Sequence, residues 1–243
     1  MKRYVIFLLI CIAGAIGVRA GRLFVLASSQ SGISSGVLPG APITEPITIS
    51  CWVRCSTTNN NMAIVSIQSN NVAGAALSRR FLGVLGSSGF SGQWTTDALD
   101  ASTRILGDPI VPGQLYHVCA VFASTTSRDL YVDGALQASD TDAPTTGFQG
   151  HKVLIGMRFT TSIAYGQFFD GMIAEVAIWN VALSQAQILA IAKGRDPRAV
   201  SPTQPLVYWP MYGDGSEEMG WNYNPSLTIS NSPARTNHPI ISR

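Results

Sequence analysis

The chain has 243 residues, of which 46% are hydrophobic and only 12% are charged, with 23 glycines and 13 prolines. This composition excludes a disordered chain, which combines low hydrophobicity with high charge. It is also too poor in lysine and glutamate for a helical protein. The abundance of serine, threonine, glycine and β-branched residues favours strands and tight turns.

Residues 1–20, MKRYVIFLLICIAGAIGVRA, predict a secretory signal peptide. Lys2 and Arg3 precede an apolar run that begins at Tyr4, and the segment ends in small residues at Val18 and Ala20. The run ends at Val18 and is therefore 15 residues long, which is shorter than the ~20 that cross a bilayer as a helix. We therefore expect no stable membrane span. The alternative is a buried N-terminal strand or helix.

The net positive charge of the chain comes from this leader. The whole chain carries a formal charge of +2, and the leader contributes three cations, Lys2, Arg3 and Arg19, and no acid. Its removal gives +2 − 3 = −1 for the remainder. The remaining chain thus lacks the basic footprint of a nucleic-acid-binding protein, and no nucleic-acid partner is expected.

Short alternating segments separated by turn residues follow along the chain. A loop is predicted over 28–46 and a less regular stretch over 90–108. The strongest strand is ITISCWVRC, in which the residues at 47, 49, 51, 53 and 55 should share one face. Strands are predicted over 21–27, 47–55, 63–68, 80–85, 115–122, 152–156, 171–179, 206–211 and 226–230.

The segment RDLYVDGALQAS, residues 128–139, predicts a β-hairpin. Asp133 and Gly134 stand between two short alternating runs, and a type I′ turn needs positive φ at both central positions. We interpret this hairpin as scaffold rather than as part of a site.

One helix is predicted over 184–193. Ser184 is a suitable N-cap, Gln187 stands at the capping-box position and Gly194 ends the helix.

These pieces, in this order, resemble the concanavalin A-like lectin/glucanase superfamily, and within it the laminin G-like and pentraxin-like group. The fragments that carry the resemblance are ITISCWVRC, LYHVCAVF, DLYVDGALQAS, KVLIG and FDGMIAEVAIWNVALSQAQI. The resemblance implies an all-β fold, an antiparallel β-sandwich jelly roll, formed as a single domain over 21–243. The apolar strand neighbours of Trp52, Trp179 and Trp209 predict that these side chains pack in the core or against the sheets.

Pentraxins carry a disulfide between the two strands that correspond to 47–55 and 115–122. Cys119 matches one position, whereas the other falls on Ser50, one residue before Cys51. A disulfide of Cys51 or Cys55 with Cys119, or buried free thiols, are therefore the alternatives. A zinc site at these cysteines and His117 is disfavoured, because Cys51 and Cys55 would lie ~13 Å apart along a strand.

The superfamily includes glucanases, whose chemistry needs two nearby carboxylates. The four glutamates are Glu45, Glu175, Glu217 and Glu218, and none is followed by an acidic residue two or four positions later. We therefore expect no enzymatic activity.

We also expect no cofactor. Calcium is a candidate by resemblance, but the segment 157–168, where pentraxins have an acidic loop, contains no Asp or Glu. The densest acidic cluster, at Asp214, Glu217 and Glu218, is interpreted as a solvated loop.

The leading hypothesis is a non-enzymatic module, secreted or on the cell surface, that binds glycan or protein through loops at one edge of the sandwich. Amides and carboxylates hydrogen-bond sugar hydroxyls, and aromatic rings pack on sugars. The alternative is a structural virion or matrix protein that forms a homo-oligomer or larger assembly. The candidate binding residues are Asn70, Asn71, Trp94, Asp97 and Tyr165.

Overall fold

The computed structural model describes most of the chain between Ala20 and Asn237. The predicted leader up to residue 19, the two asparagines at 70 and 71 and the acidic cluster at 214–218 lie outside the described residues. The described residues are 20–24, 32–35, 37–38, 40–69, 79–87, 90–98, 105–141, 148–160, 164–200, 202, 204–211, 227–230 and 234–237.

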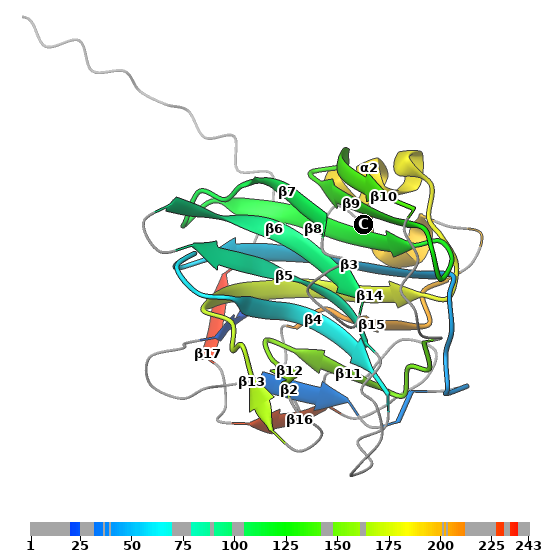
Figure 1. The fold of residues 1–243 in the computed structure, drawn as a ribbon, viewed down its shortest axis with the longest axis horizontal. Helices are drawn as coiled ribbons and strands as arrows, with labels where there is room; N and C mark the ends of the chain where they lie inside the picture. The colour runs from blue at the N-terminus through cyan, green and yellow to red at the C-terminus, as the bar shows by residue number, and fades with distance from the viewer. Residues whose placement is uncertain are drawn as a thin grey trace, which may run out of the picture.

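Two antiparallel sheets face each other, as the sequence predicted. Figure 1 looks onto one of them, called sheet B here, with the other, sheet A, behind it. Sheet A has the order β10 (Ala135–Asp140), β9 (Arg128–Val132), β8 (Leu115–Phe122), β3 (Ile47–Cys55), β14 (Gly171–Trp179), β1 (Ala20–Phe24), β17 (Ala234–Asn237), with β15 (Val207–Trp209) also paired to β14. Sheet B has the order β16 (Leu227–Ser230), β2 (Gly32–Ser35), β11 (Lys152–Ile155), β4 (Met62–Gln68), β5 (Arg79–Ser87), β6 (Phe90–Ala98), β7 (Ile105–Pro109).

Strand β3 lies near the middle of sheet A, between β8 and β14. The five residues predicted to share one face, from Ile47 to Cys55 at every second position, are all fully buried in the core between the sheets. Strands with this alternation bury one face in a sandwich. The prediction that these five side chains share one face is confirmed.

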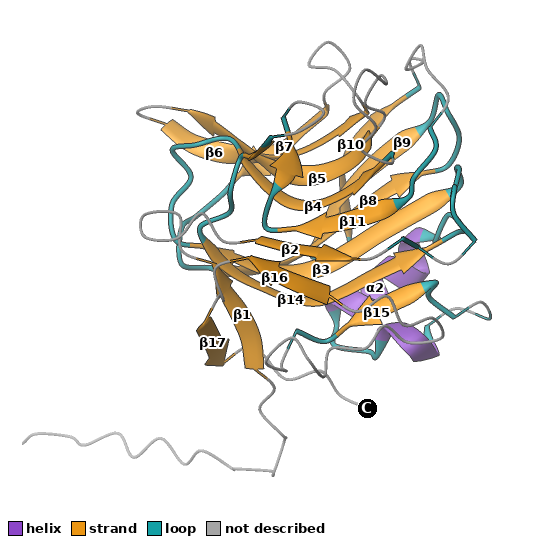
Figure 2. Cartoon of the chain, turned by 90° about the horizontal axis from the view of Figure 1, so that it is seen from below, coloured by secondary structure: helices purple, strands orange, loops and turns teal. Residues whose placement is uncertain are grey.

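Sheet A is covered on its outer face, the face that points away from sheet B. Helix α2 (Gln185–Ala192) packs there, as Figure 2 shows, with Ile188 and Ile191 buried against Trp179 and Tyr208. The predicted capping is present, because the Gln187 side chain accepts a hydrogen bond from the Ser184 backbone N–H (2.8 Å). A short 3-10 helix, η2 (Pro197–Ala199), follows α2.

Some elements differ from the sequence prediction. The stretch predicted to be irregular, 90–108, contains β6 and β7, and the predicted loop 28–46 contains β2. β2 and β6 are rich in Ser, Thr, Gly and Gln, so they lack the apolar alternation that predicts a strand. A two-stranded hairpin of β12 (Arg158–Phe159) and β13 (Tyr165–Gly166) was also not predicted, because two residues carry no periodic pattern.

Glu175 interrupts the regular pairing of β14. The register with β3 shifts between Ala174 and Ala177, and Glu175 has φ 52°. Its buried carboxylate accepts a hydrogen bond from the Tyr208 hydroxyl on β15. The bulge therefore gives the buried acid a partner and connects the late strand β15 to the sheet.

The hairpin of β9 and β10 has the predicted turn. Asp133 has φ 50° and Gly134 has φ 81°, as a type I′ turn requires. Asp133 Oδ1 also accepts a hydrogen bond from the His117 backbone N–H (2.8 Å). Gly134 lies against α2, since a Cβ there would be 2.7 Å from the Leu189 Cα.

None of the helices in the described part of the chain has the length and apolar character needed to cross a bilayer.

The contact at Gly134 predicts the cost of adding a methyl group. Gly113 has the same φ of 81° but nothing within 4 Å of its Cβ position, so it is a matched control. Gly113→Ala should lower the free energy of unfolding by about 1 kcal/mol through φ strain alone. Gly134→Ala should cost about 2–4 kcal/mol, because the methyl group also overlaps Leu189. Equal losses in urea denaturation of the two variants would contradict the packing role.

Asp133→Asn should change the free energy of unfolding by less than about 0.5 kcal/mol, because Asn-Gly supports the same turn and retains an acceptor oxygen for His117. A loss comparable to that of Gly134→Ala would show that the carboxylate charge matters there.

Candidate functional site

A layered cluster of side chains lies on the outer face of sheet B, the face that points away from sheet A. Phe81 on β5 lies across Gly83, and a Cβ at Gly83 would collide with the Phe81 ring. The guanidinium of Arg158 on β12 lies over the same ring, with Cζ 5.4 Å from the ring centroid. Stacking on an aromatic face and a cation–π attraction hold the guanidinium in place.

Gln167 fixes the arginine from a second direction. Its Oε1 accepts a hydrogen bond from Arg158 Nε (2.5 Å), and its backbone oxygen accepts one from the Ala63 N–H (2.7 Å). Ala63 lies at an irregularity of β4, where the register with β5 shifts. Gln167 also has φ 52°, which costs of order 1 kcal/mol or more in a non-glycine residue. Such strained residues and bulges concentrate at functional sites.

An aromatic pair stands beside this cluster. The rings of Phe159 on β12 and Tyr165 on β13 are stacked, with centroids 4.6 Å apart and planes 20° from parallel. Phe159 is buried in a small cluster with Leu154 and Met157, whereas Tyr165 is 45% exposed. The hairpin therefore presents an anchored aromatic ring to solvent.

A shallow surface hollow with room for about one water molecule lies at the Phe81–Arg158 pair. The lining combines amide, hydroxyl and guanidinium groups with apolar surface, so it offers both donors and acceptors of hydrogen bonds to a hydroxylated ligand. It is lined by Asn61, Phe81, Val84, Leu85, Thr95, Arg158 and Gln167.

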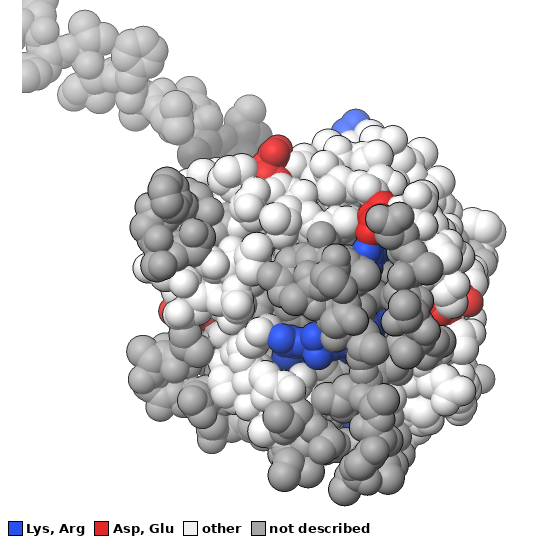
Figure 3. All heavy atoms as spheres, in the orientation of Figure 1, with Lys and Arg blue, Asp and Glu red and all other residues white. Residues whose placement is uncertain are grey.

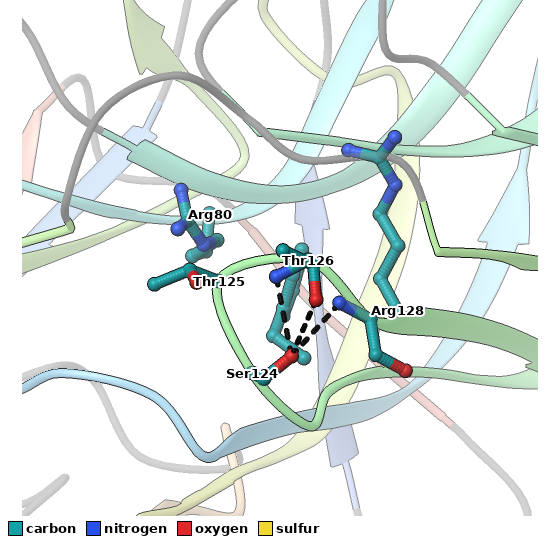
Figure 4. Close-up of a pocket in the computed structure, with 7 residues that line it drawn as sticks. Arg80, Ser124, Thr125, Thr126 and Arg128 are labelled. Atoms are coloured by element: carbon teal, nitrogen blue, oxygen red, sulfur yellow. Dashed lines mark hydrogen bonds between the residues drawn. The ribbon is translucent and has the colours of Figure 1, made fainter.

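A second hollow lies at one end of the sandwich, around the turn between β8 and β9 (Figure 4). In this turn Ser124 Oγ accepts hydrogen bonds from the backbone N–H groups of Thr126 (3.2 Å) and Ser127 (3.0 Å). The two arginines of the hollow are buried and paired with carboxylates, Arg80 with Glu45 and Arg128 with Asp140. The space leaves no room for a water molecule, so we interpret it as structural.

The candidate residues from the sequence fall in different places. Asn70 and Asn71 lie outside the described residues. Trp94 and Asp97 belong to β6, where they pair with Val84 and Phe81, but their side chains are outside the described part. Tyr165 is described and exposed. The register thus places Asp97 beside the Phe81 cluster, and the binding roles of all five remain predictions.

Sequence reasoning did not find Phe81, Arg158 or Gln167. Their proximity depends on how the hairpin of β12 and β13 packs on sheet B, and no local pattern in the sequence indicates that packing. A positive φ at Gln167 also leaves no trace in the sequence, because glutamine is not a residue typical of that region.

The described cysteines are buried free thiols, one of the two alternatives that the sequence left open, and not disulfide partners. Cys51 and Cys55 point into the core between the sheets, whereas Cys119 belongs to the cluster under α2. Cys51 and Cys119 therefore occupy opposite faces of sheet A, which corrects the disulfide expectation. Ser50 is the residue directly opposite Cys119. Burial raises the pKa of all three thiols.

His117 is a buried structural residue on the outer face of sheet A. Its Nε2 and the Ser50 hydroxyl form a hydrogen bond (2.8 Å), and its ring packs edge-on against Trp52 with centroids 5.4 Å apart. Burial lowers the pKa of His117 to about 3, so the imidazole is neutral at pH 7. Among the residues that the structure describes, no three His, Cys, Asp or Glu side chains lie close enough to hold a metal ion.

Comparison with known proteins places the chain in one family. The family model for the concanavalin A-like lectin/glucanases superfamily matches residues 28–189. A comparison with curated protein sequences finds no match.

Solved structures with the same fold have low sequence identity. A heptameric SAP-like pentraxin from Limulus polyphemus is 15% identical, with TM-score 0.58 over 88% of this chain and 95% of its own. A protein from Bacteroides ovatus that is assigned a carbohydrate-binding role is 16% identical, with TM-score 0.64 over 93% of this chain and 61% of its own, so this chain spans less than two thirds of it. A carbohydrate-binding module, CBM40, of a Ruminococcus gnavus sialidase, bound to α2,3-sialyllactose, is 16% identical, with TM-score 0.50 over 68% of this chain and 99% of its own.

The burial of His117 predicts a pH dependence of stability. The unfolded chain binds a proton at this histidine below about pH 6.5, whereas the folded chain does so only below about pH 3. The free energy of unfolding should therefore fall as the pH falls through this window, by up to about 1.4 kcal/mol per pH unit. His117→Gln should remove this part of the slope in denaturation measured at several pH values. His151→Gln should retain it, and an unchanged slope in His117→Gln would contradict the assignment.

Proposed function

Because the chain belongs to the concanavalin A-like lectin/glucanase superfamily, we propose that it is a non-enzymatic module that binds glycan on the outer face of sheet B. The observation that carries the proposal is the fixed pair of Arg158 and Gln167 over Phe81, next to the exposed ring of Tyr165. Proteins with this fold have many different functions, so the function is inferred from the residues of this site.

The site has the chemistry that sugar recognition needs. Sugars present hydroxyl groups that donate and accept hydrogen bonds, and an amide, a hydroxyl and a guanidinium line the same hollow at Asn61, Thr95 and Arg158. One side of the Tyr165 ring is covered by Phe159, which limits its motion before any ligand binds. Preorganised groups lose less entropy on binding than mobile ones, which raises affinity.

The positions of the described glutamates favour binding over hydrolysis. Glycosidases need a pair of carboxyl groups, about 5–5.5 Å apart for retention and about 6.5–9.5 Å apart for inversion. Glu45 is buried and paired with Arg80, and Glu175 is buried and hydrogen-bonded to Tyr208. Neither is placed to act on a ligand at the surface.

We place the protein outside the cell that makes it. The predicted leader ends at Ala20, and β1 begins at the same residue. Cleavage after Ala20 would leave Gly21–Phe24 to pair with β14 and β17, so the sandwich would keep this strand. N-terminal sequencing of the protein from its native source tests this: retention of residues 1–20 would contradict secretion by a cleaved leader.

Removal of the exposed Tyr165 ring or of the half-buried Gln167 amide should weaken glycan binding without unfolding the chain. Tyr165→Ala and Gln167→Ala should each lower affinity about tenfold, which corresponds to 1.4 kcal/mol, for the glycans selected on a glycan microarray. Leu136→Ala is the matched control, because Leu136 is similarly exposed (48%) but lies on β10 of sheet A. Affinities from calorimetry, with thermal melts of each variant, check the prediction.

Two outcomes would contradict the proposal. One is equal affinity in the site variants and in Leu136→Ala. The other is turnover of a bound glycan that one Asp or Glu substitution abolishes.

A further inference from the structure

We propose that the glycan bound by this module is acidic, with carboxylate or sulfate groups that contact a basic row on the outer face of sheet B. This inference rests on the proposed function and names the ligand class for the same site. It is carried by the register of β11, β4 and β5 together with the geometry of Arg158.

The basic row is defined by Lys152, Gln68 and Arg79. Lys152 on β11 pairs with Gln68 on β4, and Gln68 pairs with Arg79 on β5. Residues directly opposite each other share one face of a sheet, and neighbouring strands lie about 4.8 Å apart. The backbones at Lys152 and Arg79 are thus about 10 Å apart, with the Gln68 amide between them on the outer face.

Arg158 adds a third cation near this row. The backbone N–H of Phe159, the next residue, donates a hydrogen bond to Gln68 Oε1 (3.2 Å), so the strand that carries Arg158 is attached to the row. Arg158 is also the only charged side chain among the described residues that line the hollow. A planar guanidinium matches the geometry of carboxylate and sulfate oxygens better than that of neutral hydroxyl groups.

Acidic residues are scarce in the strands that form this face. β4, β5 and β11 contain no Asp or Glu, whereas β6 and β7 contain one each, Asp97 opposite Phe81 and the exposed Asp108. Figure 3 shows the same face: a blue group lies near its middle, over the region of β4 and β12, one red group lies beside a second blue group above it, and the other visible red groups lie toward the rim. The local potential on this face therefore favours an anionic ligand.

The experiment compares charged and neutral polysaccharides by affinity electrophoresis. Dextran sulfate and dextran form a matched pair that differs in sulfate, polygalacturonate supplies carboxylates, and the neutral glycans of the microarray complete the set. Dextran sulfate or polygalacturonate should retard the protein at least tenfold more strongly than dextran does, and less so as salt is raised.

Charge-matched variants locate the effect. Arg158→Gln and Arg79→Gln should each weaken binding of the acidic polysaccharide about tenfold, and Arg158→Lys should restore only part of it, because lysine lacks the planar fork. Arg195→Gln is the control, since it removes the same charge from an exposed residue that directly follows the turn after α2. Asp97→Asn should strengthen binding.

The outcomes separate this inference from the proposed function. If only neutral glycans bind and Tyr165→Ala weakens them, the acidic class is wrong and the glycan-binding proposal stands. If Arg195→Gln weakens acidic binding as much as Arg158→Gln does, the binding is non-specific and the inference is overturned. If no polysaccharide of either kind binds, both are overturned.

Discussion

The burial of β3 between β8 and β14, with every inward side chain enclosed between the two sheets, is the constraint on which the structure depends. Because side chains alternate along a strand, enclosing Ile47, Ile49 and their successors fixes the other residues of β3 on the outer face. One of these residues, Thr48, holds the loop before α2. Its hydroxyl donates a hydrogen bond to the Val181 carbonyl oxygen and accepts one from the Leu183 backbone N–H. The register of one strand thus determines where the helix docks.

The two outer faces consequently differ. The outer face of sheet A is covered by α2, with Cys119, Trp179 and Tyr208 enclosed beneath it. On sheet B, the small hairpin of β12 and β13 covers Leu154 and leaves Arg158 and Tyr165 partly open to solvent. A ligand of the proposed site would therefore contact rigid polar and aromatic groups on sheet B, supported by paired strands rather than by long loops.

The sequence predicted the strands whose inner face is apolar, with β4, β5 and β11 of sheet B among them, but it missed β2, β6 and β7. β3, β8 and β14 were predicted with their observed boundaries, because alternating or continuous apolar residues indicate buried strands directly. β6 was not predicted, since FSGQWTTDA has no such pattern and is held by its pairing with β5. The helix was predicted from its caps, which are local signals.

The candidate site was largely inaccessible to sequence reasoning for a related reason. Asp97 and Tyr165 were chosen as loop residues, yet both belong to strands, and the register places Asp97 next to Phe81. Arg158 is a single arginine without a motif, and it gains its position from Phe81, which is distant in the sequence, and from Gln167, which directly follows β13. Net charge does not indicate the basic row either, since the chain without the leader has a formal charge of −1. Recognition of a charged ligand depends on the local arrangement of charges rather than on their sum. Only the pairing of β11, β4 and β5 brings Lys152 and Arg79 to one face, so the basic character of that face is a property of the register and not of the composition.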